Sequence, residues 1–206
     1  AQARGEFPSN GSTLGSNGML SVFPTSRFPF QASFERTDSR SSEQFTGRDF
    51  QQQRAGVRQS YRSVGGESNT SVAYDRSTLT SQAFGRDTVD VYNAGYQRSV
   101  AANSFDASAN RTLNTRDAGE RSQFDRVFAR HNYAGDGTFT AETLASYGAT
   151  SQDLATLTGL KNEVTQLSTF ATWRRSDDDP LFATGGARLF RSVVASPLSE
   201  TETRSA

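Results

Sequence analysis

The side chains best suited to acid–base or metal chemistry are few and isolated in this sequence. His131 is the only histidine among the 206 residues, and there is no cysteine. A catalytic triad or a zinc site normally needs a second group of this kind. The acidic run Asp177-Asp178-Asp179 precedes Pro180 and is typical of a solvated turn. Because no phosphate-binding glycine loop, nucleophile elbow or HExxH pattern is present, we predict a non-enzymatic protein with no cofactor, no metal and no identifiable small-molecule substrate.

One segment carries oxygen ligands and a glycine at a calcium-like spacing. Asn132, Asp136 and Gly137 fall at the first, fifth and sixth positions of a possible twelve-residue loop. The segment is similar to the EF-hand, and the resemblance implies a helix on each side of a calcium-binding loop. However, Ala134 stands at the third position, and Thr143 stands where the family has a bidentate glutamate. These two ligands are missing, so the sequence favours a plain turn between two segments.

The composition restricts the classes of protein that remain. Acidic and basic residues both number 22, whereas a nucleic-acid surface or a polybasic membrane patch needs a basic excess. We therefore expect no nucleic-acid partner. Hydrophobic residues make up 33%, which is low for an ordinary dry core. Aromatic residues reach 11%, which argues against disorder and favours thin strands with one face toward water or a partner.

Nearly all the positive charge is carried by arginine, because Lys161 is the only lysine. The sequence favours a GC-rich genome as the explanation of this bias, and arginines that line a polar lumen or a subunit contact are the alternative.

A period of two dominates from Phe28 onward. Apolar residues alternate with polar ones in windows near 28–35, 55–62, 71–75 and 104–113. This is the pattern of strands with one apolar and one wet face. Clusters of Gly, Ser, Asn and Asp between the windows predict hairpin turns. We expect six residues to form a packing face that serves assembly or insertion: Phe28, Phe30, Phe34, Val57, Tyr61 and Phe105.

Other segments are less regular. Residues 1–27 are rich in Gly, Ser, Asn and Pro and are expected to be a flexible arm, 28–195 a β-rich domain, and 196–206 a frayed polar tail. The apolar parity changes near Val91-Tyr92, which predicts a bulge or a loop. Leu157, Leu160 and Val164 have a helical spacing, so a short helix is expected over 152–165, with a strand from Val164 onward.

We therefore predict an all-β or mainly β fold of antiparallel hairpins in a meander. No apolar run approaches the ~20 residues of a membrane helix, so a membrane would be crossed only by a closed barrel. The hairpin formed by Leu167–Arg174 and Leu181–Phe190 resembles those of bacterial outer-membrane β-barrels, and Phe28–Leu113 resembles them more loosely. This resemblance implies strands that cross the membrane in about 9–11 residues, with side chains alternating between lipid and lumen.

An extracellular filament or surface-layer subunit remains the alternative. Its strands would bury their apolar faces against neighbouring copies, and the N-terminal arm would add to a neighbour's sheet edge. The expected partners are accordingly the lipid bilayer or other copies of the chain. The expected location is the bacterial outer membrane or the cell exterior.

The missing ligands lead to a first prediction. Calorimetric titration with calcium should detect no tight binding at Asn132–Thr143, because positions three and twelve lack oxygen ligands of the required kind. Micromolar binding that is lost in Asp136→Ala would contradict this expectation.

Overall fold

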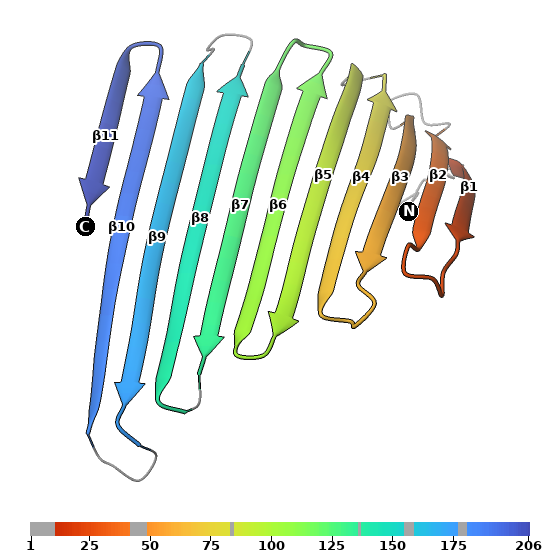
Figure 1. Ribbon diagram of the computed structural model, residues 1–206. Helices are drawn as coiled ribbons and strands as arrows, with labels where there is room; N and C mark the ends of the chain where they lie inside the picture. The colour runs from red at the N-terminus through yellow and green to blue at the C-terminus, as the bar shows by residue number, and fades with distance from the viewer. Residues whose placement is uncertain (1–10, 42–48, 83–84, 136, 155–158, 177–180) are drawn as a thin grey trace, which may run out of the picture.

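The protein folds into one antiparallel β-sheet, described here from a computed structural model (Figure 1). The structure describes residues 11–41, 49–82, 85–135, 137–154, 159–176 and 181–206. Within these ranges the strands are β1 (Gly11–Val22), β2 (Phe30–Ser41), β3 (Phe50–Arg62), β4 (Ser68–Ser81), β5 (Gly85–Val100), β6 (Asn103–Arg116), β7 (Arg121–Ala134), β8 (Phe139–Asp153), β9 (Leu160–Arg174), β10 (Phe182–Ser196) and β11 (Ser199–Ser205).

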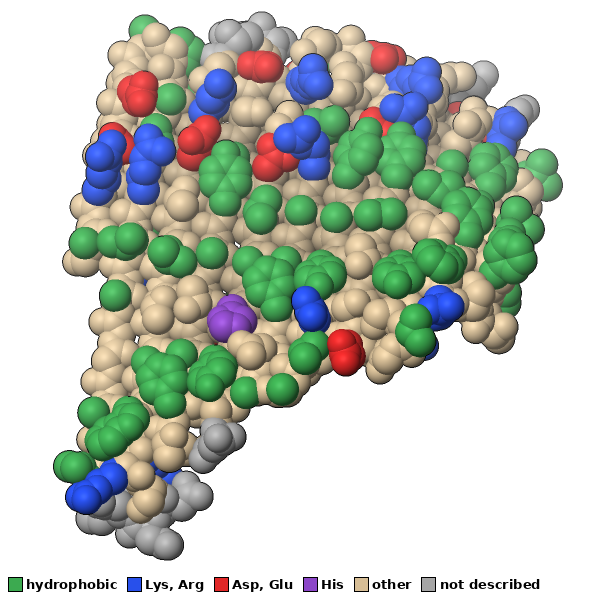
Figure 2. All heavy atoms as spheres, viewed as in Figure 1, with side chains coloured by type: hydrophobic (Ala, Val, Ile, Leu, Met, Phe, Trp, Pro, Cys, Tyr) green, Lys and Arg blue, Asp and Glu red, His purple; other side chains and the backbone are tan. Residues whose placement is uncertain are grey.

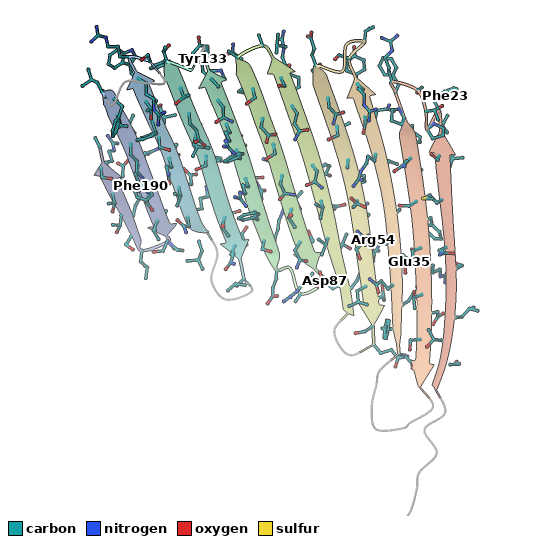
Figure 3. The ribbon with its side chains drawn as sticks, turned by 90° about the horizontal axis from the view of Figure 1, so that it is seen from below. Phe23, Glu35, Arg54, Asp87, Tyr133 and Phe190 are labelled. Carbon is teal, nitrogen blue, oxygen red and sulfur yellow. The ribbon has the colours of Figure 1, made fainter. Side chains whose placement is uncertain are left out.

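The sheet is a simple meander. Each strand pairs antiparallel with the next one in the chain, so the spatial order is β1 to β11 without a crossover. The strands lie in a single layer, and β1 and β11 form two separate edges (Figures 1 and 3). The predicted all-β meander is therefore confirmed, and the sheet is not closed into a barrel. The described residues contain no helical segment that could span a bilayer.

Tight turns fix the strand register. Between β6 and β7, the Gly119 N–H donates to the Arg116 carbonyl at 3.0 Å, and the Arg116 N–H donates to the Glu120 carbonyl at 3.0 Å. Gly119 has φ of 81°, a left-handed conformation that costs other L-residues energy. A type I turn followed by such a glycine is a common way to close an antiparallel hairpin. The glycine in the Asp117-Ala118-Gly119 cluster is thus required by its backbone conformation.

Both terminal segments contribute strands, which corrects the expected arm and tail. Gly11–Val22 pairs with β2 along its whole length, and Ser199–Ser205 pairs with β10. Sheet pairing uses the backbone and tolerates Gly, Ser and Asn when a neighbouring strand is already in place. The part of the arm before residue 11 lies outside the described residues.

The expected helix at 152–165 and the irregularity at Val91-Tyr92 are also wrong. Strand β8 runs to Asp153 and β9 begins at Leu160, while residues 155–158 lie outside the described part. Pairing with β8 and β10 has overridden the helical spacing, and the strand expected from Val164 onward is confirmed. Strand β5 pairs without interruption through Val91 and Tyr92. The parity change arises because Val89 and Val91 lie on the more polar side of the sheet.

A single layer leaves the molecule without an internal core. Among the hydrophobic residues that the structure describes, Val193 alone is buried, with 9% of its surface exposed. Large side chains such as Leu20, Phe34 and Leu189 are about half exposed. A folded domain normally buries such side chains between two layers. Whatever covers the apolar side of this sheet must therefore come from outside it.

The turn geometry generates a second prediction. Gly119→Ala should destabilise the fold by about 1 kcal/mol, because alanine must adopt a left-handed conformation. Gly148→Ala is the matched control. Nothing lies within 4 Å of a Cβ placed at Gly148, and alanine in a strand interior is favoured over glycine by about 0.5–1 kcal/mol. Urea unfolding followed by the fluorescence of Trp173 will measure both. Equal stability of the two variants would contradict the assigned turn.

Candidate functional site

The most distinctive surface of the protein is one side of the sheet, which we call the apolar face. Residues directly opposed in a sheet share a side, so the register assigns each strand residue to one of the two faces. The apolar face carries Val57, Tyr74, Tyr92, Ala109, Val127, Tyr147, Leu167 and Leu189, together with the residues at every second position from these. Figure 2 shows this face, on which hydrophobic side chains gather across the whole sheet.

Five residues of the predicted packing face, Phe30, Phe34, Val57, Tyr61 and Phe105, lie on the apolar face by register, and Phe28, which precedes β2, stacks against Tyr61 on the same side. The rings of Phe28 and Tyr61 are 4.8 Å apart, and those of Phe105 and Tyr96 are 5.9 Å apart. Phe28, Phe34 and Val57 are 43–55% exposed, because no described residue covers them. Whether they serve assembly or insertion remains a prediction.

A broad belt of the apolar face is almost free of charge. On β8 it is formed by Phe139, Ala141, Thr143, Ala145 and Tyr147. Phe139 and Tyr147 are separated by about 27 Å along the strand, at about 3.4 Å per residue. Among the described strands, Arg98 and His131 are the only charged or imidazole side chains on this belt. Both lie near the lower ends of their strands.

Aromatic residues mark the two margins of the belt, and small residues lie between them. At the upper margin the rings of Tyr74 and Tyr92 are 4.9 Å apart, and at the lower margin those of Tyr133 and Phe139 are 5.9 Å apart. A shallow groove of about 680 Å³ crosses the sheet below the upper tyrosines. Its floor includes small and aliphatic side chains: Val72, Ala94, Ala109 and Val127.

Charged side chains gather beyond the upper margin, where they pair with one another (Figure 2). Asp90 accepts from Arg76 at 2.7 Å and from the Tyr74 hydroxyl at 2.6 Å. Arg111 donates to Asp125 at 2.6 Å. Arg191 and Arg204 both donate to Glu202. The charges thus form a neutralised row at the end of the belt rather than a net-charged patch.

The belt runs obliquely across the strands. On β6, Arg111 lies opposite Tyr92, and Tyr92 is two residues lower on β5 than Asp90. Arg191 lies opposite Thr165, in a row two positions lower again. The lower margin descends as well, together with the lower ends of the strands from β3 to β10 (Figure 1). The two margins are roughly parallel, and both cross the strands at a slant. The strands are therefore tilted relative to the belt.

The opposite side, which we call the polar face, is rich in Ser, Thr, Asn, Gln and Arg. Asn110 donates to the Asn93 side chain at 2.7 Å, and Arg130 pairs with Glu142 at 3.0 Å. Glu35 and Arg54 are directly opposed on β2 and β3 (Figure 3). Large apolar residues interrupt this face, among them Phe124 and Phe128 on β7 and Phe170, Phe182 and Val194 on β9 and β10. Its polar side chains make it the more water-compatible of the two faces.

The isolated chemical groups of the sequence are not brought together into a catalytic or metal site in the described ranges. His131 lies within 3.0 Å of the Asn103 side-chain oxygen, on the apolar face. No three His, Asp or Glu side chains within the described ranges are close enough to hold a metal ion. The EF-hand-like segment lies at the end of β7 and the start of β8, where strands stand in place of the family's helices. Asp136 and the acidic run 177–179 lie outside the described residues.

Most of the belt on β7 and β8 was not predicted from the sequence. The segment 120–150 mixes polar and small residues, so its period was obscured. The signal was nevertheless present as the alternation from Phe139 to Tyr147, with an aromatic residue at each end. The facing charges of the upper margin come from different strands, and only the register reveals them.

No protein-family model matches the chain, and no curated protein is significantly similar to it.

The two-faced strand β2 generates a third prediction. Phe30→Asp should abolish assembly or membrane insertion, because it places a charge on the apolar face and removes a ring whose burial is worth roughly 1.5–3 kcal/mol. Gln31→Asp, on the polar face, should be tolerated. Sedimentation of the protein with lipid vesicles and in plain buffer will measure both states. If both variants behave like the parent protein, β2 does not bury its apolar side.

Proposed function

We propose that this sheet is part of the wall of a bacterial outer-membrane β-barrel and has a structural, non-enzymatic role. The apolar face contacts lipid and the polar face lines a water-filled interior. The observation that carries the proposal is the almost charge-free belt, bounded by aromatic residues on both sides and by paired charges beyond one margin. Transmembrane barrels have this arrangement because aromatic rings are favoured at the lipid–water boundary.

The height of the belt supports this assignment. A rise of about 27 Å along β8, tilted by about 40° as in known barrels, spans about 21 Å across the membrane. The rings at both ends add to this height, which approaches the apolar band of about 25 Å typical of outer-membrane proteins. The slant of the belt across the strands is the tilt that a barrel requires.

The hydrogen-bonding pattern sets a condition on the proposal. Strands β2 to β9 pair on both sides, so most of their backbone groups are satisfied without water. Strand β10 pairs with β9 along its length but with β11 only through Phe190–Ser196, so Phe182–Leu189 also leaves one side unpaired within the described sheet. Strands β1 and β11 have one unpaired side each within the described sheet. Lipid does not tolerate open edges, so both edges must pair with further strands in the membrane.

The open edges also favour the second candidate, an extracellular filament or surface-layer subunit. Exposed edges can add strands from neighbouring copies, and the apolar faces of two copies can pack together. In this arrangement the belt contacts protein rather than lipid. The two candidates therefore differ in what surrounds Trp173, which lies at the lower margin and is 42% exposed.

Trp173 provides the fourth prediction, because it is the only tryptophan in the chain. In phosphatidylcholine vesicles its emission should shift to the blue and be quenched by lipids brominated on their acyl chains. Bromines near the headgroups should quench more strongly than bromines near the bilayer centre, since the residue lies at a margin. A subunit that assembles in plain buffer and whose emission is insensitive to brominated lipids would contradict the membrane proposal and support the filament.

Adjacent residues on β8 supply a matched control. Ala145→Arg places a charge in the middle of the belt and should cost about 2–4 kcal/mol of stability in the bilayer. Ser146→Arg, on the polar face, should cost little. The difference in urea midpoint between the two variants, measured in vesicles, reports which face contacts lipid. A reversed order would place the polar face toward lipid.

A further inference from the structure

The polar face carries an excess of positive charge. Its acidic residues on the described strands are Glu35, Asp75, Asp87, Asp106 and Glu142. They are outnumbered by its arginines, which are Arg54, Arg58, Arg62, Arg116, Arg126, Arg130, Arg174 and Arg188. The apolar face differs, because the charges at its upper margin largely neutralise one another.

Several of these arginines already have partners. Arg54 lies 3.9 Å from Asp75, Arg116 lies 3.5 Å from Asp87, and Arg130 lies 3.0 Å from Glu142. Arg188 donates to the Gln166 side chain at 3.3 Å and lies over the Phe190 ring. Arg126, in the middle of the sheet on β7, is exposed and makes no hydrogen bond or ion pair through its side chain with any described residue.

The surroundings of Arg126 contain hydrogen-bonding groups and no carboxylate. Its direct neighbours across the strands are Asn110 on β6 and Gly148 on β8. Directly opposed Cβ atoms are about 4.5–5.5 Å apart and diagonal neighbours about 7–8 Å apart, within reach of a guanidinium. The diagonal neighbours all bear hydroxyls: Ser108, Thr112, Ser146 and Thr150. Phe124 and Phe128 flank Arg126 on its own strand.

Arg126 also lines a hollow of about 520 Å³ on this face, together with Ser71, Asn93, Gly95, Ser108 and Phe128. The hydrogen bond from Asn110 engages the Asn93 oxygen and leaves the Asn93 NH₂ free to donate. A Cβ at Gly95 would lie 3.2 Å from the Ser71 hydroxyl, so the glycine keeps the floor of the hollow open. The volume falls in the range of small-molecule sites.

We propose that this hollow binds a small organic anion through a carboxylate or phosphate group, with Arg126 as the main contact. A guanidinium donates two parallel hydrogen bonds to either group. Hydroxyl and amide donors nearby complete the contacts, and Phe128 packs against the apolar body of the ligand. This site deepens the proposed function. It rests on that proposal only for the claim that the polar face lines a water-filled interior, where the site would favour the passage of anions.

Calorimetry with benzoate and phenyl phosphate tests this site, and benzamide is the uncharged control. Folded protein should bind at least one of the two anions and not benzamide. Arg126→Gln should weaken binding at least tenfold, whereas Arg130→Gln should change it less than twofold, because Arg130 is on the same face and already paired with Glu142. The preferred probe distinguishes a carboxylate from a phosphate ligand. Equal weakening by both variants would mean diffuse attraction and would overturn the site, as would no binding of either anion.

A second variant, Arg126→Lys, separates a loss of binding from a loss of folding. Circular dichroism checks that each variant is folded. Lysine keeps the charge but loses the bidentate geometry, so binding should fall by an intermediate factor. Unchanged binding would overturn the assignment of Arg126 as the main contact. The measurement uses folded protein in any solubilising medium, so its result is independent of the quenching of Trp173 by brominated lipid.

Discussion

Backbone pairing between neighbouring strands, within a single layer, is the interaction on which everything else in this protein depends. Packing between layers plays no part in the described sheet, so the hydrogen-bonded ladders and short turns must hold the strands in register. Register in turn decides which side chains share a face. The apolar belt, the paired charges and the hollow around Arg126 exist only because successive strands keep the same alternation. A slip by one residue on any strand would mix the two faces.

The two faces differ in how their charged and polar side chains are arranged. The apolar face neutralises its charges in pairs such as Arg76–Asp90 and places them beyond a margin of tyrosines, leaving a surface that loses little on contact with lipid or another apolar surface. The polar face keeps hydroxyls, amides and uncompensated arginines, which water solvates at no cost. The composition follows from this division, because a chain with mainly polar side chains on one face of its sheet needs few hydrophobic residues, and 33% suffices.

The sequence predicted the fold class well, because period two is visible wherever large apolar residues alternate with polar ones, as from Phe28 to Phe34. The sequence-based prediction was wrong where the local composition favours one structure and pairing with a neighbouring strand imposes another. Gly11–Val22 reads as a flexible arm, yet β2 supplies a template for it. Val89 and Val91 lie on the polar face. The change in apolar alternation therefore predicted a bulge or a loop where β5 is in fact continuous. The candidate hollow was beyond prediction, since Ser71, Asn93 and Arg126 come from different strands and only the register brings them together.

The number of strands has a consequence for how the edges can be closed. In an antiparallel meander of eleven described strands, β1 and β11 run in the same direction. Suppose that neighbouring sheets keep their charged margins on the same side of a membrane and their apolar faces toward the same surroundings. Then β11 can meet only a β1 edge, and the two strands run parallel. A ring closed in that way would contain a parallel seam among antiparallel pairs. Antiparallel pairing throughout instead requires an odd number of additional strands between the two edges, so parity alone divides the possible assemblies into two classes.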